Sequence, residues 1–400
     1  MRVLIVSKIL VVAAYRRKLD EIAARPEVER LVVVTPPAWQ EPGGRKLCLE
    51  PQSGVRRYDL RVEPIWFNGS YHLFLWPRLA RALREVKPDL VHIDEEPYNL
   101  ATAHGTWLAA RLGLPTLFFT WQNLLRRYPP PFSWFERSVF RRSAYAIAGT
   151  TEALRVLRAK GYAGPGAVIP QFGVDPDLFS PDGRTIGGPP VIGFVARLVE
   201  EKGVLVLLDA LAGLGGAWRL HVIGSGPLEA KARRRAARLA IAHRITWERG
   251  IPSTQVPERL RTFSLLVQPS LTRRHWKEQF GRALVEAMAC GVPVVGSTSA
   301  EIPNVIGTAG LVVPEGDPLA LRAAIARLLD DPTLRADLAR RGRARALECY
   351  THQRIAEQTV GVYQAALSAA RHGSPVQAIG DNGAARPCAP GPGRPPSRRD

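Results

Sequence analysis

The sequence is poor in cysteine and in acidic residues, and it has no long hydrophobic run. Its 400 residues include only four cysteines, and no two of them form a CxxC pair. This spacing argues against a zinc site and against the disulfide framework of a small secreted domain, so a cytoplasmic location is expected. No stretch approaches the roughly 18 uninterrupted apolar residues of a membrane span, and the apolar N-terminal run indicates a buried strand rather than a signal peptide.

The shortage of acidic residues leaves the chain strongly basic. There are 36 acidic residues against 55 Lys and Arg, so the formal charge is +19, and the excess is spread over both halves. A positive surface of this kind suits anionic ligands such as phosphates, acidic lipid headgroups or nucleic acid. Because no helix-turn-helix or RNP pattern is present, we expect no nucleic-acid partner.

Apolar, β-branched runs alternate with helical stretches along most of the chain. The first series of expected strands lies at 3–7, 31–35, 90–93, 116–120 and 145–149, and the second at 191–196, 219–223, 265–269 and 292–296. Such alternation predicts an α/β fold with two doubly wound parallel sheets, which bind ligands at the carboxyl ends of their strands. The expected domains are 1–182 and 190–350. A helix at 351–372 is a candidate to cross back to the first domain, and a disordered tail is expected at 373–400.

The segment 278–291, EQFGRALVEAMACG, combines a glycine, a helix and two carboxylates. Gly281 is expected to open the helix, with Glu278 in the loop ahead of it and Glu286 about a turn and a half inside. The backbone N–H groups of Phe280, Gly281 and Arg282 are then placed to bind an anion, while the two carboxylates can bind sugar hydroxyls. Taken alone, the pattern equally suits an acidic residue favoured by the helix dipole and a solvated glutamate.

The pattern does not stand alone. VIGFVARLVEEKG at 191–203, VIGSGPL at 222–228 and the segment at 278–291 resemble, in this order, the donor-binding half of the retaining GT-B glycosyltransferases of family 4. EIPNVIGTAGLVVPEGDP at 301–318 is similar to the same family's continuation. The resemblance covers the second half well and the first half loosely. It implies a GT-B fold, in which two Rossmann-like domains face a central cleft, and retaining transfer of a hexosyl group from a UDP- or GDP-linked sugar without a metal or other cofactor.

The resemblance also implies roles for individual residues. Arg197 and Lys202 would offset the charge of the departing diphosphate, Glu278 would hold the donor sugar and Glu286 the ribose. The implied donor-binding residues are Glu286, Phe280, Gly281, Arg282, Gly224, Arg249 and Ile251. Without the resemblance, Arg197 and Lys202 would be read as solvated loop residues. The Gly224 turn also reads as a plain strand-to-helix turn, with Ser225 as the cap and Pro227 as the first helical residue.

The first half departs from the family pattern. Lys8 begins a segment in which many members carry Gly-Gly, and Gln122 stands where a histidine is usual. Glutamine can hydrogen-bond a sugar hydroxyl but cannot act as a base near pH 7, so the leaving phosphate is expected to accept the proton. The acceptor-side candidates are Gln122, Asn123, Glu95, Glu96 and His72. The carboxylates at 94–96 are also read as helix caps, and His72 as structural.

Two further segments bear on partners. Residues 126–142, RRYPPPFSWFERSVFRR, mix aromatic residues with arginines. This composition suits either the surface of an anionic membrane or a helix that packs its aromatics inward. In the first case the acceptor is lipid-linked and the protein is peripheral on the inner face of the cytoplasmic membrane. The D-x-D at 175–177 is read as a turn rather than a metal site.

The sequence therefore predicts a glycosyltransferase of polysaccharide biosynthesis that uses a nucleotide sugar and a glycan, glycolipid or lipid-linked acceptor. A nucleotide-sugar epimerase or hydrolase on the same fold is the alternative enzyme, and it lacks a clear histidine–carboxylate pair in the first domain. A non-catalytic protein that binds nucleic acid or membrane is the other alternative, and it draws on the charge alone.

Overall fold

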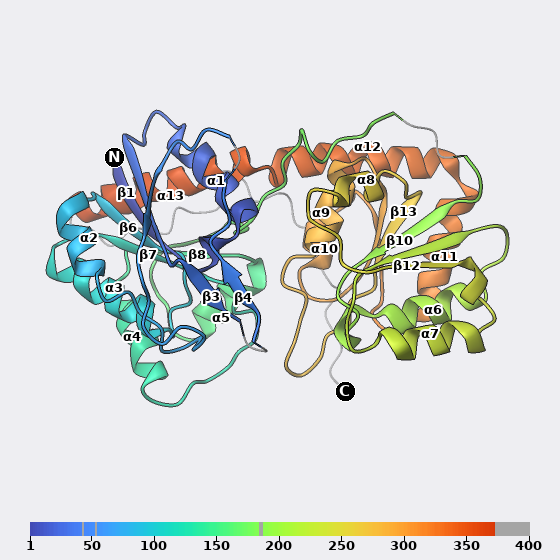
Figure 1. The fold of residues 1–400 in the computed structure, drawn as a ribbon, viewed down its shortest axis with the longest axis horizontal. Coiled ribbons are helices and arrows are strands. Elements are labelled where there is room, and N and C mark those ends of the chain that lie inside the picture. Colours follow the sequence, from blue (N-terminus) through green and yellow to red (C-terminus); the bar gives the residue numbers. More distant parts are fainter. Residues whose placement is uncertain (42–43, 53, 184–186, 373–400) are drawn as a thin grey trace. The chain divides into compact units, whose positions relative to one another are not determined.

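The computed structural model describes residues 1–41, 44–52, 54–183 and 187–372, which form two compact units (Figure 1). The first unit comprises Met1–Gly173 and the helix α13 (His352–His372), and the second comprises Val174–Thr351. The tail expected at 373–400 lies outside the described residues. Whereas the first domain was expected to end at 182, the units divide after Gly173. Residues following Gly173 are held by the second unit, because the Arg261 guanidinium donates to the carbonyl oxygens of Leu178 and Ser180.

The first unit is built on a seven-stranded parallel sheet with the order β5-β2-β1-β6-β7-β8-β9. Its strands are β1 (Arg2–Val6), β2 (Arg30–Thr35), β5 (Asp59–Val62), β6 (Leu90–Ile93), β7 (Thr116–Thr120), β8 (Tyr145–Ala148) and β9 (Gly166–Val168). The five strands expected from apolar runs all form. The two edge strands, β5 and β9, were missed because they are short and contain no fully buried residue.

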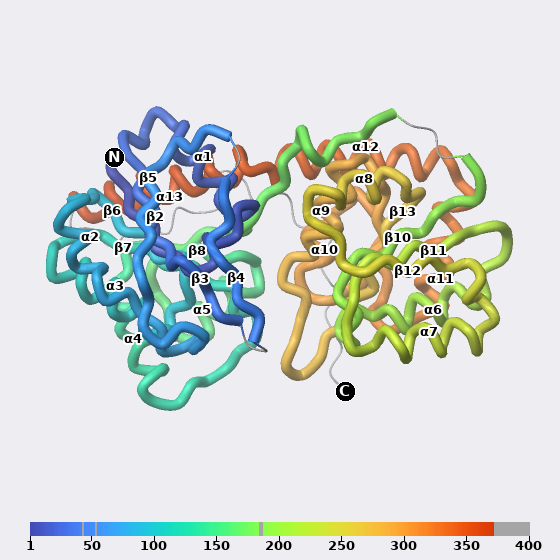
Figure 2. Tube along the Cα trace, in the orientation of Figure 1, coloured from blue at the N-terminus to red at the C-terminus, as the bar shows by residue number. Residues whose placement is uncertain are grey.

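Both faces of this sheet are covered, as continuous apolar strands require. On β1, Val3 and Ile5 pack on the side of α1 (Ala13–Ala23) and α13, whereas Leu4 and Val6 pack on the side of α2 (Leu79–Val86) and α3 (Leu100–Arg111). In Figure 2 the blue α1 and the red α13 run side by side, although they stand at opposite ends of the described chain. The remaining elements of this unit are η1 (Ile9–Val11), α4 (Phe132–Arg142), α5 (Thr151–Ala159) and the antiparallel pair β3 (Ala38–Gln40) and β4 (Lys46–Cys48).

Helix α13 is part of the core of the first unit. Its residues Ile355, Val360 and Tyr363 are buried in the same cluster as β1 and β2. The Tyr363 hydroxyl lies 2.8 Å from Nδ1 of His92, a buried residue of β6. Burial lowers the pKa of His92 to about 4, so the imidazole stays neutral inside this core. The helix thus fills a position that the first 173 residues leave open.

The second unit repeats the architecture with a six-stranded parallel sheet of order β12-β11-β10-β13-β14-β15. Its strands are β10 (Val191–Val195), β11 (Arg219–Ile223), β12 (Ile245–Glu248), β13 (Leu265–Gln268), β14 (Val294–Ser297) and β15 (Leu311–Val313). Its helices are η2 (Glu200–Lys202), α6 (Val204–Ala212), α7 (Glu229–Arg238), η3 (Ala242–Arg244), α8 (Val256–Leu260), α9 (Arg282–Ala289), α10 (Ile302–Ile306), α11 (Pro318–Asp330) and α12 (Pro332–Cys349). Helices α6, α7 and α11 cover one face, and α9 packs against β13 and β14.

The cysteines differ in state. Cys48 is exposed and Cys290 buried, and both are free thiols. Cys349, in contrast, is disulfide-bonded.

Candidate functional site

A glycine turn starts the helix that carries the two predicted glutamates. Gly281 caps α9 with φ at +75°, a left-handed conformation. A Cβ at this position would lie 3.0 Å from the Leu284 side chain and 3.2 Å from Nε2 of Gln268, so the turn favours glycine both in conformation and in space. Glu278 precedes the helix and Glu286 lies within it, as the sequence predicts.

Three donors converge on the carboxylate of Glu278, whose side chain is only 7% exposed. Its Oε2 lies 2.6 Å from Nζ of Lys202, 2.9 Å from Nε2 of Gln268 and 2.8 Å from Oγ of Ser270. Lys202 follows β10, while Gln268 ends β13, so the group forms at the carboxyl ends of two neighbouring strands. Lys202 Nζ also lies 4.8 Å from the centre of the Trp276 ring, where the π face attracts a cation. The structure thus brings Lys202 and Glu278 together.

The second glutamate has its own cationic neighbour. Arg282 Nε donates to Oε1 of Glu286 at 2.6 Å, across one turn of α9. Burial raises the pKa of the Glu286 carboxyl, and the Arg282 guanidinium only partly opposes this effect. The Arg282 side chain is 41% exposed in this pair against 11% for Glu286, so the arginine can change partners at little cost.

Arg197 is not part of either pair. Its side chain is exposed and forms no hydrogen bond or ion pair with another described residue. Gly224 lies close to it in the fold: a Cβ on this glycine would fall 1.9 Å from the carbonyl oxygen of Ala196. The cap expected at Ser225 and Pro227 is wrong, because α7 begins two residues after Pro227, with Leu228 at its N-cap.

The residues predicted to lie against the nucleotide base of the donor are at the surface of the second unit. The side chain of Arg249 is 83% exposed, and its Nε lies 3.8 Å from Oε2 of Glu229. Ile251 is half-buried in the loop after β12. Phe280 is buried and packs edge-on against Tyr350, which is an ordinary core contact within this unit. Their roles toward a donor stay predictions.

In the first unit, the carboxylates after β6 are enclosed rather than open. Glu95 forms an ion pair with Lys8, and its Oε1 accepts the Lys8 backbone N–H at 2.8 Å. Asp94 lies 3.6 Å from Lys18 Nζ and accepts from Nε2 of Gln171 at 2.9 Å. The sequence did not predict any of these three partners, Lys8, Lys18 and Gln171. The helix-cap reading of these carboxylates is wrong, because α3 starts later, with Asn99 at its N-cap.

Glu96 joins the ends of β6 and β7. Its two carboxylate oxygens accept from Oγ1 of Thr120 at 2.6 Å and from the backbone N–H of Trp121 at 2.8 Å. Burial raises the pKa of Glu96 to about 7, although both hydrogen bonds act in the opposite direction. A carboxyl that titrates near neutrality can exchange a proton at working pH, which is the property required of an acid or base.

Gln122 is held on both sides by neighbouring residues. Lys160 Nζ donates to its Oε1 at 2.9 Å, and its Nε2 lies 3.3 Å from the Tyr128 hydroxyl. Asn123 beside it is buried. His72 packs against Phe132, with the ring centres 4.9 Å apart, and burial lowers its pKa. The structure therefore gathers Gln122, Tyr128 and His72 around one aromatic cluster.

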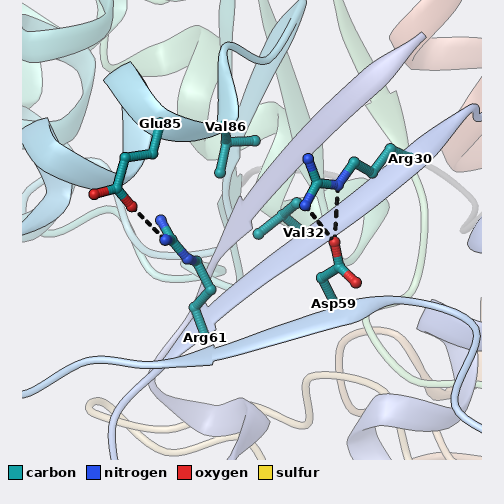
Figure 3. Close-up of a pocket in the computed structure, with 6 residues that line it drawn as sticks. All are labelled: Arg30, Val32, Asp59, Arg61, Glu85 and Val86. Atoms are coloured by element: carbon teal, nitrogen blue, oxygen red, sulfur yellow. Dashed lines mark hydrogen bonds and ion pairs between the residues drawn. The ribbon is translucent and has the colours of Figure 1, made fainter.

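A separate hollow of about 300 Å³ lies at the edge of the first sheet (Figure 3). Two ion pairs line it, Arg30 with Asp59 at 2.8 Å and Arg61 with Glu85, together with Val32 and Val86. None of the predicted site residues lines it, and its charges are already paired, so we assign it no role.

Several residues that shape these groups were not predicted from the sequence, although the sequence pattern contains a signal for two of them. Gln268 and Ser270 are polar residues at the end of an apolar strand, where sheet topology places functional side chains. Lys8, Lys18 and Lys160 gave no such signal. Within the described residues, no three or more His, Cys, Asp or Glu side chains are arranged to hold a metal ion. Nor does any described helix have the length and apolar character needed to cross a membrane.

Two parallel-sheet α/β units with polar groups at the carboxyl ends of their strands define a protein of two Rossmann-like domains. Residues 178–345 match the family "Glycosyl transferases group 1", and residues 12–171 match the "Glycosyl transferase 4-like domain". The chain belongs to the GT-B glycosyltransferases of family 4, and the predictions of family and fold class are confirmed.

Individual relatives agree with this assignment. A GDP-mannose-dependent alpha-(1-6)-phosphatidylinositol monomannoside mannosyltransferase of Mycolicibacterium smegmatis is 33% identical over 203 residues, which cover 46% of this chain and 53% of that protein. A putative colanic acid biosynthesis glycosyltransferase, WcaL, of Salmonella typhimurium is 29% identical over 252 residues, or 61% of each chain. The matched part thus spans only about half to three fifths of these relatives' lengths.

Solved structures share the fold. HepE of Anabaena in complex with UDP has a TM-score of 0.71 at 17% identity, covering 91% of this chain and 100% of that one. Sucrose-phosphate synthase of Thermosynechococcus elongatus has a TM-score of 0.69 at 20% identity, covering 92% and 100%. At these identities the likeness concerns the fold.

Proposed function

We propose that this protein is a retaining glycosyltransferase of the hexosyl-transferring type. It takes a sugar from a nucleotide-diphosphate donor, UDP- or GDP-linked, and passes it to a hydroxyl of a glycan, glycolipid or lipid-linked acceptor. The observation that carries the proposal is the contact between Lys202 and Glu278 beside the N-terminus of α9, in a chain of this family. Similar proteins support either base, since one relative is GDP-mannose-dependent and a structural neighbour was solved in complex with UDP.

The roles of the donor-side residues follow from their chemistry. Lys202 is the cation that would move from the Glu278 carboxylate to the donor diphosphate, where it offsets the charge that grows as the glycosidic bond breaks. Glu278 is then released to accept hydrogen bonds from the sugar hydroxyls, while Gln268 and Ser270 still donate to its Oε2. Arg197, which is exposed and unpaired among the described residues, would add the second positive charge. Glu286 would bind the ribose, with Arg282 and the α9 N-terminus beside the phosphates.

The acceptor side is proposed on hydrogen-bonding grounds. Because Lys160 donates to Oε1 of Gln122, the glutamine amide is oriented to donate to an acceptor oxygen, and it takes no proton. The proton of the attacking hydroxyl then goes to the leaving phosphate on the same face of the sugar, which accounts for retention. No metal enters this scheme, because cationic side chains neutralise the diphosphate. We place the protein in the cytoplasm, working at the membrane when the acceptor is lipid-linked.

A ligand screen tests the proposal. Thermal unfolding is measured with UDP-, GDP- and ADP-sugars, because a donor at 100-fold its dissociation constant adds about 2.7 kcal/mol to the free energy of unfolding. We expect one nucleotide class to raise the unfolding temperature, and Lys202→Ala to abolish the rise. If no nucleotide sugar shifts it, the donor site is wrongly assigned. Conversion of the donor sugar without any acceptor would favour the epimerase or hydrolase instead.

A further inference from the structure

The region around α4 carries a local excess of positive charge. Residues 97–151 contain six arginines and one glutamate, which gives a formal charge of +5. That glutamate, Glu136, is buried and pairs with Lys160, so it contributes little negative charge to the surface. The exposed charge of this part of the first unit is therefore positive.

Helix α4 separates its aromatic residues between two faces. Phe135 and Phe140 pack inward against the cluster of Phe118, Val139 and Tyr162, which confirms the inward-packing reading for these phenylalanines. Trp134 is not buried in this cluster, because it is 58% exposed. Arg137 and Arg141 are exposed at three and seven residues after Trp134, which places all three on one helical face.

The exposed apolar surface extends beyond the helix. In the segment leading into α4, Leu125 is 60% exposed, and the arginines at 126 and 127 are exposed beside it. The loop that contains Tyr71 and Leu73 reaches the start of α4, because His72 between them packs against Phe132. Tyr71 and Leu73 are themselves 42% and 40% exposed. We call the set Leu125, Arg126, Arg127, Trp134, Arg137 and Arg141 the α4 surface.

We propose that the α4 surface docks the protein onto an anionic lipid membrane. Arginines attract acidic headgroups, while an exposed tryptophan and leucine can insert at the boundary between headgroups and acyl chains. A membrane with acidic lipids supplies a continuous layer of negative charge, which can meet all of these arginines at once. The inference deepens the proposed function, and rests on it, by naming the surface of the first unit that would contact the membrane; it uses none of the donor-side residues.

Vesicle sedimentation tests this docking surface with the full chain. Binding is measured to vesicles of phosphatidylcholine mixed with phosphatidylglycerol, and to vesicles of phosphatidylcholine alone. We expect binding to the anionic vesicles only. Arg137→Glu/Arg141→Glu should weaken it by at least about 30-fold, because two attractions of the strength typical for a basic residue near a charged membrane are lost. Trp134→Ser should weaken it about tenfold at unchanged charge.

The chain offers matched controls in its second unit. Arg234 and Arg238 are exposed on α7 with the same spacing, so Arg234→Glu/Arg238→Glu makes the same change of charge elsewhere. Leu319, which is 67% exposed on α11, gives Leu319→Ser as the apolar control. Both controls should bind vesicles like the unchanged protein.

Three results would overturn the docking surface. The first is equal loss of binding in the α4 and α7 charge variants, which would indicate a response to total charge. The second is the absence of vesicle binding altogether, and the third is binding to a short DNA duplex that depends on Arg137 and Arg141 and exceeds vesicle binding. Nucleotide-sugar stabilisation is measured on the same variants. Its retention separates a failure of docking from a failure of the proposed function.

Discussion

The two units share a parallel-sheet architecture, yet the charged side chains at the ends of their strands are buried to different extents. In the first unit, the side chains of Lys8 and Glu95 are 7% and 2% exposed, so both charges are buried and neutralise each other. In the second, Lys202 is 16% exposed against 7% for Glu278. A buried pair costs too much to separate, whereas a pair with one accessible cation can exchange its partner for an anionic ligand. The comparison assigns the strand-end charges of the first unit to structure, and it fits the proposal that those of the second unit bind the donor.

The largest expected effect is on stability, through the Lys8–Glu95 pair. Lys8→Met should lower the free energy of unfolding by about 3–5 kcal/mol, because it leaves a buried carboxylate without its partner. Urea unfolding measures the change. The double variant Lys8→Met/Glu95→Leu should recover most of the loss.

Arg273, which is exposed and pairs with Glu200 at 2.9 Å, provides the control for a surface pair. Arg273→Met should cost no more than about 1 kcal/mol. If Lys8→Met costs no more than Arg273→Met, the first unit does not depend on its buried charges and the contrast between the units fails.

The next effect is on catalysis, through the Lys202–Glu278 pair. Lys202→Ala and Glu278→Ala should each lower kcat by about 10²–10³-fold, the loss typical for removal of one group that stabilises transition-state charge. Thermal unfolding of Lys202→Ala without ligand should change less than that of Lys8→Met, because Gln268 and Ser270 still donate to the Glu278 carboxylate. Steady-state kinetics with the donor found in the ligand screen provide the measurement, and Arg273→Ala serves as the control. Unchanged turnover in both variants would contradict the donor-site assignment.

These two predictions also mark what the sequence can and cannot disclose. The alternation of apolar runs predicts both sheets, and the resemblance at 191–203 and 278–291 leads to Lys202 and Glu278, which the structure brings into contact. The same resemblance also suggests Arg197, but its exposed side chain contacts neither Lys202 nor Glu278. The partners of Glu95 and Asp94 could not be predicted, because a lysine in a basic chain is expected to be solvated. Only the packing of β1 and α1 against β6 removes Lys8 and Lys18 from water.

A third effect concerns pH and sharpens the account of the first unit. The folded protein holds the Glu96 proton up to about pH 7, whereas the unfolded chain releases it near the ordinary pKa of 4.5. The ionised carboxyl therefore costs stability progressively as the pH rises from 4.5 to 7, and no further above that. Glu96→Gln should be more stable than the unchanged protein at about pH 8 and gain less at about pH 5, by a difference of about 2–3 kcal/mol.

Glu85 provides a control of opposite sign. The side chains of Arg81 and Arg61 lower the pKa of this carboxyl to about 2. Its ionised form therefore stabilises the fold above pH 4.5, and this contribution is lost as the pH falls toward 2. Denaturant unfolding at several pH values compares Glu96→Gln with Glu85→Gln. A Glu96→Gln profile that runs parallel to the unchanged protein would show that Glu96 is ionised throughout.

The smallest effect concerns a residue that positions Glu278. Gln268→Leu removes one of three donors to Oε2 and should lower kcat about tenfold, with KM less affected, because the carboxylate loses its fixed orientation. Gln255→Leu, the same substitution at an exposed glutamine of the same unit, should have no effect on either constant. A rise in KM alone would assign Gln268 to donor binding rather than to orientation.

The return of α13 to the first unit has a consequence for biosynthesis. A ribosome delivers the seven strands of the first sheet before it delivers the helix that buries Val3, Ile5 and Leu31 on one side. While the second unit is being translated, α13 has not yet been made and this apolar face stays uncovered. During that time it can bind chaperones or aggregate. The second unit, by contrast, is continuous in sequence and can mature as it emerges, so the half of the chain that is made first is the half that is completed last.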